Sequence, residues 1–137
     1  MYPEELVSPM RAELTNNGFS ELKDQESVSK AFDNMSGTAV LVVNSVCGCA
    51  AGSARPGVLS SLTGESKPDH LYTVFAGQDS DATAKAREYL LPYPPSSPSI
   101  AIFKDGDLVH FVERHHIEGR SAEMISNHLK EAYKTFC

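Results

Sequence analysis

Apolar residues at helical spacing predict two helices within residues 1–36. The first covers residues 4–16 and ends at the Asn-Asn-Gly sequence, with an apolar face formed by Leu6, Met10 and Leu14. The second lies within residues 20–34 and begins near Asp24 or Ser27, both of which are good N-cap residues. We expect both helices to precede the core of the fold, with the first packed on its outside.

The middle of the chain alternates between strand and helix patterns. Residues 39–46 form a continuous aliphatic run that is too short for a helix and too uniform for an exposed strand, which predicts a buried central strand. A helix is predicted over residues 50–62, with a kink at Pro56. A second strand at residues 71–76 is followed by another helix, which is capped near Asp79.

The last third of the chain predicts an antiparallel hairpin and a closing helix. A proline-rich loop at residues 92–99 leads into strands at 100–104 and 108–113, which an Asp-Gly-Asp turn separates. Residues 121–136 show the pattern of an amphipathic helix. The core order is βαβαββα with helices in front, which predicts an α/β fold with a mixed sheet flanked by helices. The length of 137 residues fits a single domain over residues 1–137.

Charge and composition narrow the function classes. The formal net charge is −6 and the basic residues are scattered, so the chain lacks the basic surface that nucleic-acid binding requires. The N-terminal residues are acidic where a signal peptide is positive, and no apolar run is long enough to span a membrane. We therefore expect a soluble cytoplasmic protein with no nucleic-acid or membrane partner. Because the helices leave no large apolar stripe uncovered, we expect a monomer.

Two of the three cysteines, Cys47 and Cys49, flank Gly48 just after the predicted central strand. A reducing cytoplasm keeps thiols reduced, so a close pair of this kind indicates catalysis or metal binding. Chemistry in open α/β sheets gathers beyond the carboxyl ends of strands, and a helix N-terminus there lowers the pKa of a thiol. We expect Cys47 to be the attacking thiolate and Cys49 its partner, with Gly48 easing the strain of a disulfide ring closed through one residue.

Two other roles for the cysteine pair stay open at this point. Free cysteines are often buried as small hydrophobic residues, and two thiolates one residue apart can hold Cu(I) or half of a zinc site. Zinc would need further ligands from Cys137 or the five histidines, none of which stands at a recognisable ligand spacing. We therefore expect no metal at the site. Cys137, the last residue, can resolve a mixed disulfide, link two molecules or lie on a frayed end.

Several polar residues are candidates for supporting roles. Asn44 and Ser45 lie in an apolar run, so their side chains need partners, and we expect them to hydrogen-bond the loop that carries the cysteines. Arg55 follows within two helical turns and either supports the thiolate or extends along the helix surface. Arg114 and His115, with the histidine after them, end the last strand. They either bind the carboxylates of a small thiol or form a solvated hairpin end.

The order of elements and three local features resemble the thioredoxin fold. These features are the cysteine motif after the first predicted strand, Pro56 in the helix that follows, and Ser97 and Pro98 before the hairpin. The resemblance implies that Pro98 is cis and faces the cysteines. The motif differs from that of thioredoxins in having one residue between the cysteines and Val46 in place of a tryptophan, so general disulfide reductase activity is not implied.

Over nearly its whole length the chain resembles the bacilliredoxin family. The resemblance rests on residues 42–56 (VVNSVCGCAAGSARP), 74–79 (VFAGQD), 94–101 (PPSSPSIA), 114–120 (RHHIEGR) and Cys137. It implies a thiol–disulfide oxidoreductase that needs no cofactor and removes bacillithiol, or a similar low-molecular-weight thiol, from proteins that carry it as a mixed disulfide. Cys47 would attack the mixed disulfide and accept the small thiol, and Cys49 or a second small thiol would release it. Weak protein disulfide isomerase activity is the alternative that the same chemistry allows.

Overall fold

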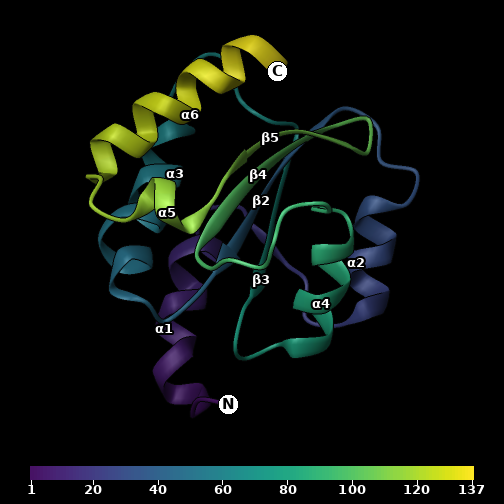
Figure 1. The fold of residues 1–137 in the computed structure, drawn as a ribbon, viewed down its shortest axis with the longest axis vertical. Coiled ribbons are helices and arrows are strands. Elements are labelled where there is room, and N and C mark those ends of the chain that lie inside the picture. The colour runs from purple at the N-terminus through teal and green to yellow at the C-terminus, as the bar shows by residue number, and fades with distance from the viewer.

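Five strands form one mixed sheet in the computed structural model, which describes residues 1–137. The strands are β1 (Ser20–Glu21), β2 (Thr38–Asn44), β3 (His70–Phe75), β4 (Ser99–Lys104) and β5 (Asp107–Val112). Their order across the sheet is β1-β3-β2-β4-β5 (Figure 1). The pairs β1–β3 and β2–β3 are parallel, whereas β2–β4 and β4–β5 are antiparallel. The predicted mixed α/β sheet is therefore confirmed.

Helices cover both faces of the sheet. They are α1 (Glu4–Thr15), α2 (Gln25–Phe32), the π-helical turn η1 (Ala50–Ala54), α3 (Arg55–Ser61), α4 (Ser80–Glu88), α5 (Arg114–Ile117) and α6 (Ala122–Phe136). The first helix packs with α3, α5 and α6 on one side of the sheet, and α2 and α4 lie on the other (Figure 1). No helix has the length and apolar character needed to cross a bilayer.

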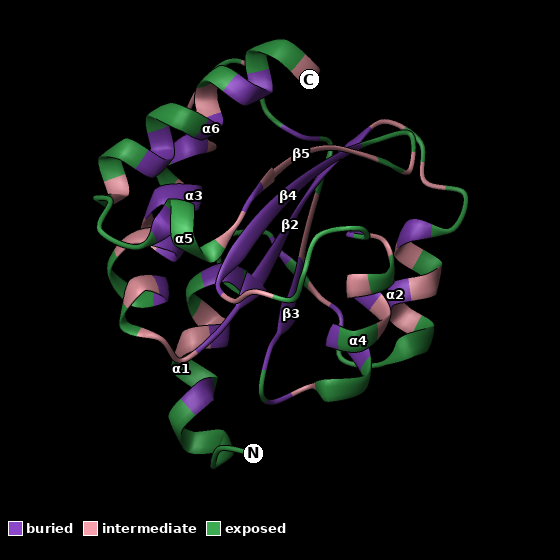
Figure 2. Cartoon of the chain, viewed as in Figure 1, coloured by how far each residue is buried: buried purple, intermediate pink, exposed green.

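The central strand β2 is buried at every residue, and Figure 2 shows β2 and β4 as the inner strands of the sheet. Val40 and Val42 belong to the core cluster under α3 and α6, whereas Leu41 and Val43 belong to the cluster under α2 and α4. Successive side chains of a strand point to opposite faces, so a strand with two covered faces must be apolar throughout. This explains the uninterrupted aliphatic run in the sequence.

Two predicted boundaries were wrong at the start of the chain and at the end of the sheet. Ser20–Glu21 is not helical but pairs with β3 as a short edge strand, and α2 begins only after Asp24. The Asp24 carboxylate accepts a hydrogen bond from the Ser27 N–H at 2.8 Å, which satisfies a free donor at the start of the helix. The segment after β5 forms the separate helix α5 instead of a solvated hairpin end.

The helix predicted over residues 50–62 is divided in an unexpected way. It opens with the π-helical turn, in which the Arg55 N–H donates to the Ala50 carbonyl, and continues as α3. Pro56 stands in the first turn of α3, where its missing N–H removes no hydrogen bond within that helix. Gly57 then lets α3 approach α6 closely, since a Cβ at this position would lie 2.8 Å from the Cβ of Ile125. This close packing fixes the helix that follows the cysteines.

Candidate active site

Both cysteines of the motif lie at the carboxyl end of β2, where the chain turns into the helical segment. The Cys47 carbonyl accepts a hydrogen bond from the Ala50 N–H at 2.9 Å, which begins that segment. Both cysteines are half-buried, but Cys47 lines a cleft, whereas Cys49 packs against the core cluster under α3 and α6. Both are free thiols, and their Sγ atoms lie 2.7 Å apart. The thiols are therefore in contact, and only one of them faces a cleft.

The surroundings shift the pKa values of the two thiols in opposite directions. A hydrogen bond from the Cys49 thiol lowers the pKa of Cys47, and the N–H groups of Cys49 and Ala50 and the charge of Arg114 act in the same direction. Burial raises the pKa of Cys49, and the adjoining Cys47 sulfur adds to the rise. A thiolate is the nucleophile in exchange, so this asymmetry favours Cys47 as the attacking group.

Arg114 reaches the candidate nucleophile from the start of α5. Its Nη2 lies 3.2 Å from Cys47 Sγ, and its Nη1 donates to the Ser97 carbonyl at 3.1 Å. The Glu118 carboxylate pairs with Nε and holds the guanidinium in place. Arg114 is therefore in contact with the thiol, and the interpretation of this stretch as a solvated hairpin end is wrong for this residue. The His115 ring lies instead beside Glu113, with its Nδ1 3.2 Å from the carboxylate.

The Ser97–Pro98 peptide bond is cis, as the resemblance to thioredoxins implied. Ser99 pairs with Val43, so Pro98 lies beside the end of β2 from which the cysteines emerge. Ser97 lines the same cleft as Cys47. A second cis bond, before Pro92, has no counterpart among the predictions.

A buried hydrogen-bond network supports the loop before Cys47. The Cys47 N–H donates to Ser45 Oγ at 3.2 Å, and the Ser45 N–H donates to Asn44 Oδ1 at 2.9 Å. Arg55 Nη1 donates to Asn44 Oδ1 at 2.9 Å and to the Ser45 carbonyl at 3.0 Å. Asn44 and Ser45 therefore hydrogen-bond the cysteine loop, as expected from the sequence.

Arg55 itself does not extend along the helix surface. Only 2% of the residue is exposed, and its Nε lies 3.0 Å from a Glu13 carboxylate oxygen of α1 in an ion pair. Its hydrogen bonds and its ion pair go to Asn44, Ser45 and Glu13, and none of them goes to a thiol sulfur. Arg55 is thus a positioning residue that holds the turn between β2 and the helix.

The wall of the cleft opposite Arg114 comes from the N-terminal residues, which nothing in the sequence pattern suggested. Tyr2 donates its N–H to Gln78 Oε1 at 2.8 Å, and Gln78 Nε2 donates back to the Tyr2 carbonyl at 3.1 Å. Together with Gly77, Tyr2 lines a cleft of about 350 Å³ that contains Cys47, Ser97 and Arg114. We call this space the Cys47 cleft. It has room beside the exposed sulfur for a segment of a second molecule.

Asp79 does not cap α4 as predicted. The residue stands at the N-cap position, but its side chain makes no capping hydrogen bond. Its two carboxylate oxygens instead accept hydrogen bonds from Arg11 Nη1 at 2.6 Å and Nη2 at 3.2 Å. This two-pronged ion pair ties α1 to the turn after β3, next to the segment that Tyr2 contacts.

In the dithiol form, neither the backbone conformation nor the surroundings of position 48 require a glycine. Its φ angle lies outside the left-handed region, and a Cβ at this position would meet no atom within 4 Å. The expected easing of strain in a Cys47–Cys49 disulfide concerns the oxidised form and stays a prediction.

Cys137 lies far from the other two thiols. Burial raises its pKa and the Thr38 hydroxyl opposes that rise, which locates the thiol near the start of β2. Cys47 follows the other end of this strand, whose 7 residues span about 20 Å at the usual rise per residue. Cys137 therefore cannot resolve a mixed disulfide on Cys47 of the same molecule.

No group of three or more His, Cys, Asp or Glu side chains is arranged to hold a metal ion, so the thiol pair has no third ligand nearby.

Sequence comparisons identify the family. The family model described as disulphide isomerase matches residues 2–137. A bacilliredoxin of Cytophaga hutchinsonii is 67% identical over 133 residues, which cover 97% of this chain and 98% of the relative. A bacilliredoxin of Halalkalibacterium halodurans is 53% identical over 136 residues, which cover 99% of this chain and 94% of the relative.

Solved thioredoxins share the fold at low sequence identity. A mutant thioredoxin of Halobacterium salinarum superposes with a TM-score of 0.59 at 15% identity and covers 88% of this chain and 91% of its own. Reduced thioredoxin pre-protein of Schistosoma mansoni gives a TM-score of 0.57 at 18% identity and covers 88% and 99%. The full-length family match, the fold and the adjoining thiols agree: the chain belongs to the bacilliredoxin family and is a thiol–disulfide oxidoreductase with the thioredoxin fold.

Proposed function

We propose that the protein removes bacillithiol, or a similar low-molecular-weight thiol, from client proteins that carry it as a mixed disulfide. The observation that carries this proposal is the asymmetry of the two thiols. Cys47 faces a cleft and has a lowered pKa, whereas Cys49 packs against the core and has a raised pKa. An accessible thiolate beside a protonated partner suits the acceptance of a thiol from a mixed disulfide.

The first step is an exchange between three sulfurs. The Cys47 thiolate attacks the small-thiol sulfur of the mixed disulfide, forms a new disulfide with it and displaces the client's thiolate. The client leaves reduced, and its thiolate takes up a proton from water. Arg114, 3.2 Å from Cys47 Sγ, stabilises the attacking thiolate before the bond forms.

The second step releases the small thiol by one of two routes. Cys49, whose Sγ lies 2.7 Å from that of Cys47, loses its proton to water and attacks Cys47 Sγ, which displaces the small thiolate and forms a Cys47–Cys49 disulfide. In the other route a second small thiolate attacks the bound small thiol, which yields a disulfide of two small thiols and free Cys47. The first route leaves an oxidised enzyme that an external dithiol or small thiol must reduce.

The Cys47 cleft supports a protein client. Tyr2, Ser97 and Arg114 surround the exposed sulfur, and the cleft opens to the surface. We propose that an extended client segment lies beside Pro98 and between Tyr2 and Arg114, with its mixed disulfide directed at Cys47. No cofactor takes part in this reaction, and we propose a monomeric enzyme that works in the cytoplasm, where dithiols persist.

Disulfide isomerase activity is the second candidate, and the description of the matching family favours it. The same thiolate would attack a wrong disulfide in a client and later leave when another client thiol attacks the adduct, with no net oxidation or reduction. The two activities differ in their substrate, because only the first releases a small thiol.

The test substrate is a client protein whose cysteine carries bacillithiol as a mixed disulfide. Without a reductant, we expect the native protein and Cys49→Ser each to free about one client thiol per molecule, the first ending as the Cys47–Cys49 disulfide and the second as the Cys47 adduct, and Cys47→Ser to free none. Added small thiol should then allow repeated turnover by the native protein and by Cys49→Ser, but not by Cys47→Ser. Cys137→Ser removes a thiol outside the cleft and serves as the matched control with native turnover. Equal losses in Cys47→Ser and Cys49→Ser, or full activity in Cys47→Ser, would contradict the proposal.

A further inference from the structure

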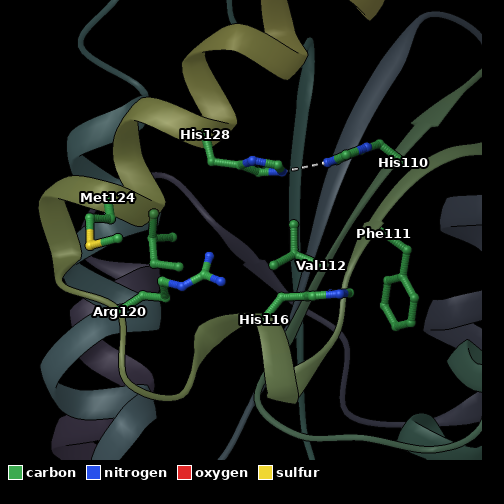
Figure 3. A pocket seen from close by; sticks show the side chains of 8 residues that line it. His110, Phe111, Val112, His116, Arg120, Met124 and His128 are labelled. Carbon is green, nitrogen blue, oxygen red and sulfur yellow. Dashed lines mark hydrogen bonds between the residues drawn. The ribbon is translucent and has the colours of Figure 1, made fainter.

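A second pocket, of about 180 Å³, lies between β5 and α6, beside His116 of α5. Its lining residues come from β5, α5, the connection after α5, and α6 (Figure 3). Four are basic and no acidic side chain lines the space, and the apolar wall includes Val112 and Met124. The four basic residues are His110, His116, Arg120 and His128, and we call the space the histidine pocket.

Arg120 and His116 present donors that the protein itself does not use. Arg120 makes no salt bridge, and its carbonyl is held by the Ser53 hydroxyl, which fixes the chain at this point. The Glu113 N–H lies 3.3 Å from His116 Nδ1 and donates to it, so the proton of the neutral ring is on Nε2. This Nε2–H is then free to donate to a ligand.

The remaining two imidazoles are in contact at the top of the pocket. His110 Nε2 and His128 Nε2 lie 2.8 Å apart, so one proton between them satisfies both nitrogens (Figure 3). Burial lowers the pKa of His110, and the neighbouring His128 and His116 lower it further. No acidic side chain lines the pocket, so nothing in its wall balances a second proton on this pair. An anion in the pocket would supply that balance.

We infer that the histidine pocket binds a small organic carboxylate. The carboxylate would pair with the Arg120 guanidinium and accept hydrogen bonds from the imidazoles, while its carbon part contacts Val112 and Met124. An apolar cavity of about 150 Å³ accommodates a benzene ring, so this pocket has room for a ring of that size with its carboxylate at the open side. The site shares no lining residue with the Cys47 cleft and does not depend on the exchange reaction.

Benzoate is a suitable probe, with benzyl alcohol as a neutral molecule of the same shape. Binding is measured by calorimetry and by the imidazole NMR signals of the reduced native protein. We expect benzoate to bind and to shift the His110, His116 and His128 signals. Benzyl alcohol should bind at least tenfold more weakly, because it cannot pair with Arg120.

Two exposed positions provide the variants. Arg120→Gln and His128→Gln should each weaken benzoate binding roughly tenfold or more. Lys130→Gln, which removes a positive charge from α6 outside the pocket, should leave it unchanged. The double variant Cys47→Ser/Cys49→Ser should bind benzoate as the native protein does, which separates this site from the exchange activity. Benzoate binding that leaves the three imidazole signals unchanged, or that Lys130→Gln weakens as much as Arg120→Gln, would overturn the inference.

Discussion

Arg114 places its Nη2 3.2 Å from the Sγ of Cys47, although the two residues stand 67 positions apart in the chain. The same guanidinium donates to the Ser97 carbonyl, next to the cis bond of Pro98. One side chain thus connects the end of β2, the loop before β4 and the start of α5. The thiol and the loop beside it are held in one arrangement by a residue that also favours the thiolate.

Replacing Arg114 should weaken the nucleophile without unfolding the protein. In Arg114→Gln we expect the pKa of Cys47 to rise, because the charge that favours the thiolate is lost. The rate of Cys47 alkylation at neutral pH should fall roughly two- to fivefold, as for an exposed charge pair. The check is a pH profile of alkylation by iodoacetamide, followed by mass spectrometry of the Cys47 peptide.

The sign of the pH dependence is set by the direction of the shift. A lowered pKa keeps Cys47 as thiolate at lower pH, so its alkylation should reach half of its maximum below the value of about 8.5 that is usual for a free thiol. In Arg114→Gln this midpoint moves to higher pH. Arg120→Gln, which removes a similar charge from the other side of α5, should leave the midpoint unchanged, and an equal shift in both variants would show a general charge effect.

Gly48→Ala should disfavour the Cys47–Cys49 disulfide while leaving the stability of the dithiol form nearly unchanged. The reduced protein has open space at this position, so its free energy of unfolding should change by less than about 0.5 kcal/mol. Ring closure through one residue demands backbone freedom that alanine lacks, so the Cys47–Cys49 disulfide should become roughly two- to fivefold less favourable. Equilibration in thiol redox buffers measures this ratio, and an unchanged ratio would show that glycine has no role in the oxidised form.

Gly57→Ala should destabilise the fold by pressing α3 away from α6. The added methyl group would lie 2.8 Å from the Ile125 side chain, and overpacking of this kind costs roughly 1–3 kcal/mol. Gly52→Ala is the matched control, because nothing lies within 4 Å of its Cβ position. Chemical denaturation of the two reduced variants compares them directly, and equal stabilities would mean that the two helices adjust without cost.

Cys137→Ser should leave the exchange reaction unchanged within about twofold, because distant sites act independently. The raised pKa of this thiol keeps it protonated at neutral pH, so it should also be alkylated more slowly than Cys47. A strong loss of turnover in this variant would mean that Cys137 of a second molecule takes part. Mass spectrometry under non-reducing conditions distinguishes that case by detecting a linked dimer.

Local sequence patterns were sufficient to locate the candidate nucleophile. The aliphatic run of residues 39–46 required a strand with two buried faces, and the helical pattern after it placed Cys47 at the junction. The Asp-Gly-Asp turn defined the hairpin β4–β5 in the same way, since turn chemistry is local. These signals depend on residues within a few positions of one another, which is why they are readable in one sequence.

The contacts that complete the site depend on residues far apart in the chain. The α5 helix has only four residues, too few to show a helical period, so no local pattern directs Arg114 toward Cys47. Arg11 reaches Asp79 across 68 positions and replaces the capping role that a local interpretation favoured. Arg55 is a charged residue of a type that is usually exposed, and its burial follows only from its partners Asn44 and Ser45.

The central claim is that Cys47 itself accepts the small thiol. The most direct measurement is peptide mass spectrometry of reduced Cys49→Ser protein after incubation with a client that carries bacillithiol as a mixed disulfide. If Cys47 accepts the small thiol, the spectra will show a bacillithiol adduct on Cys47 and one freed client thiol for each adduct. An adduct on Cys137, or no adduct with the client still modified, would contradict the claim.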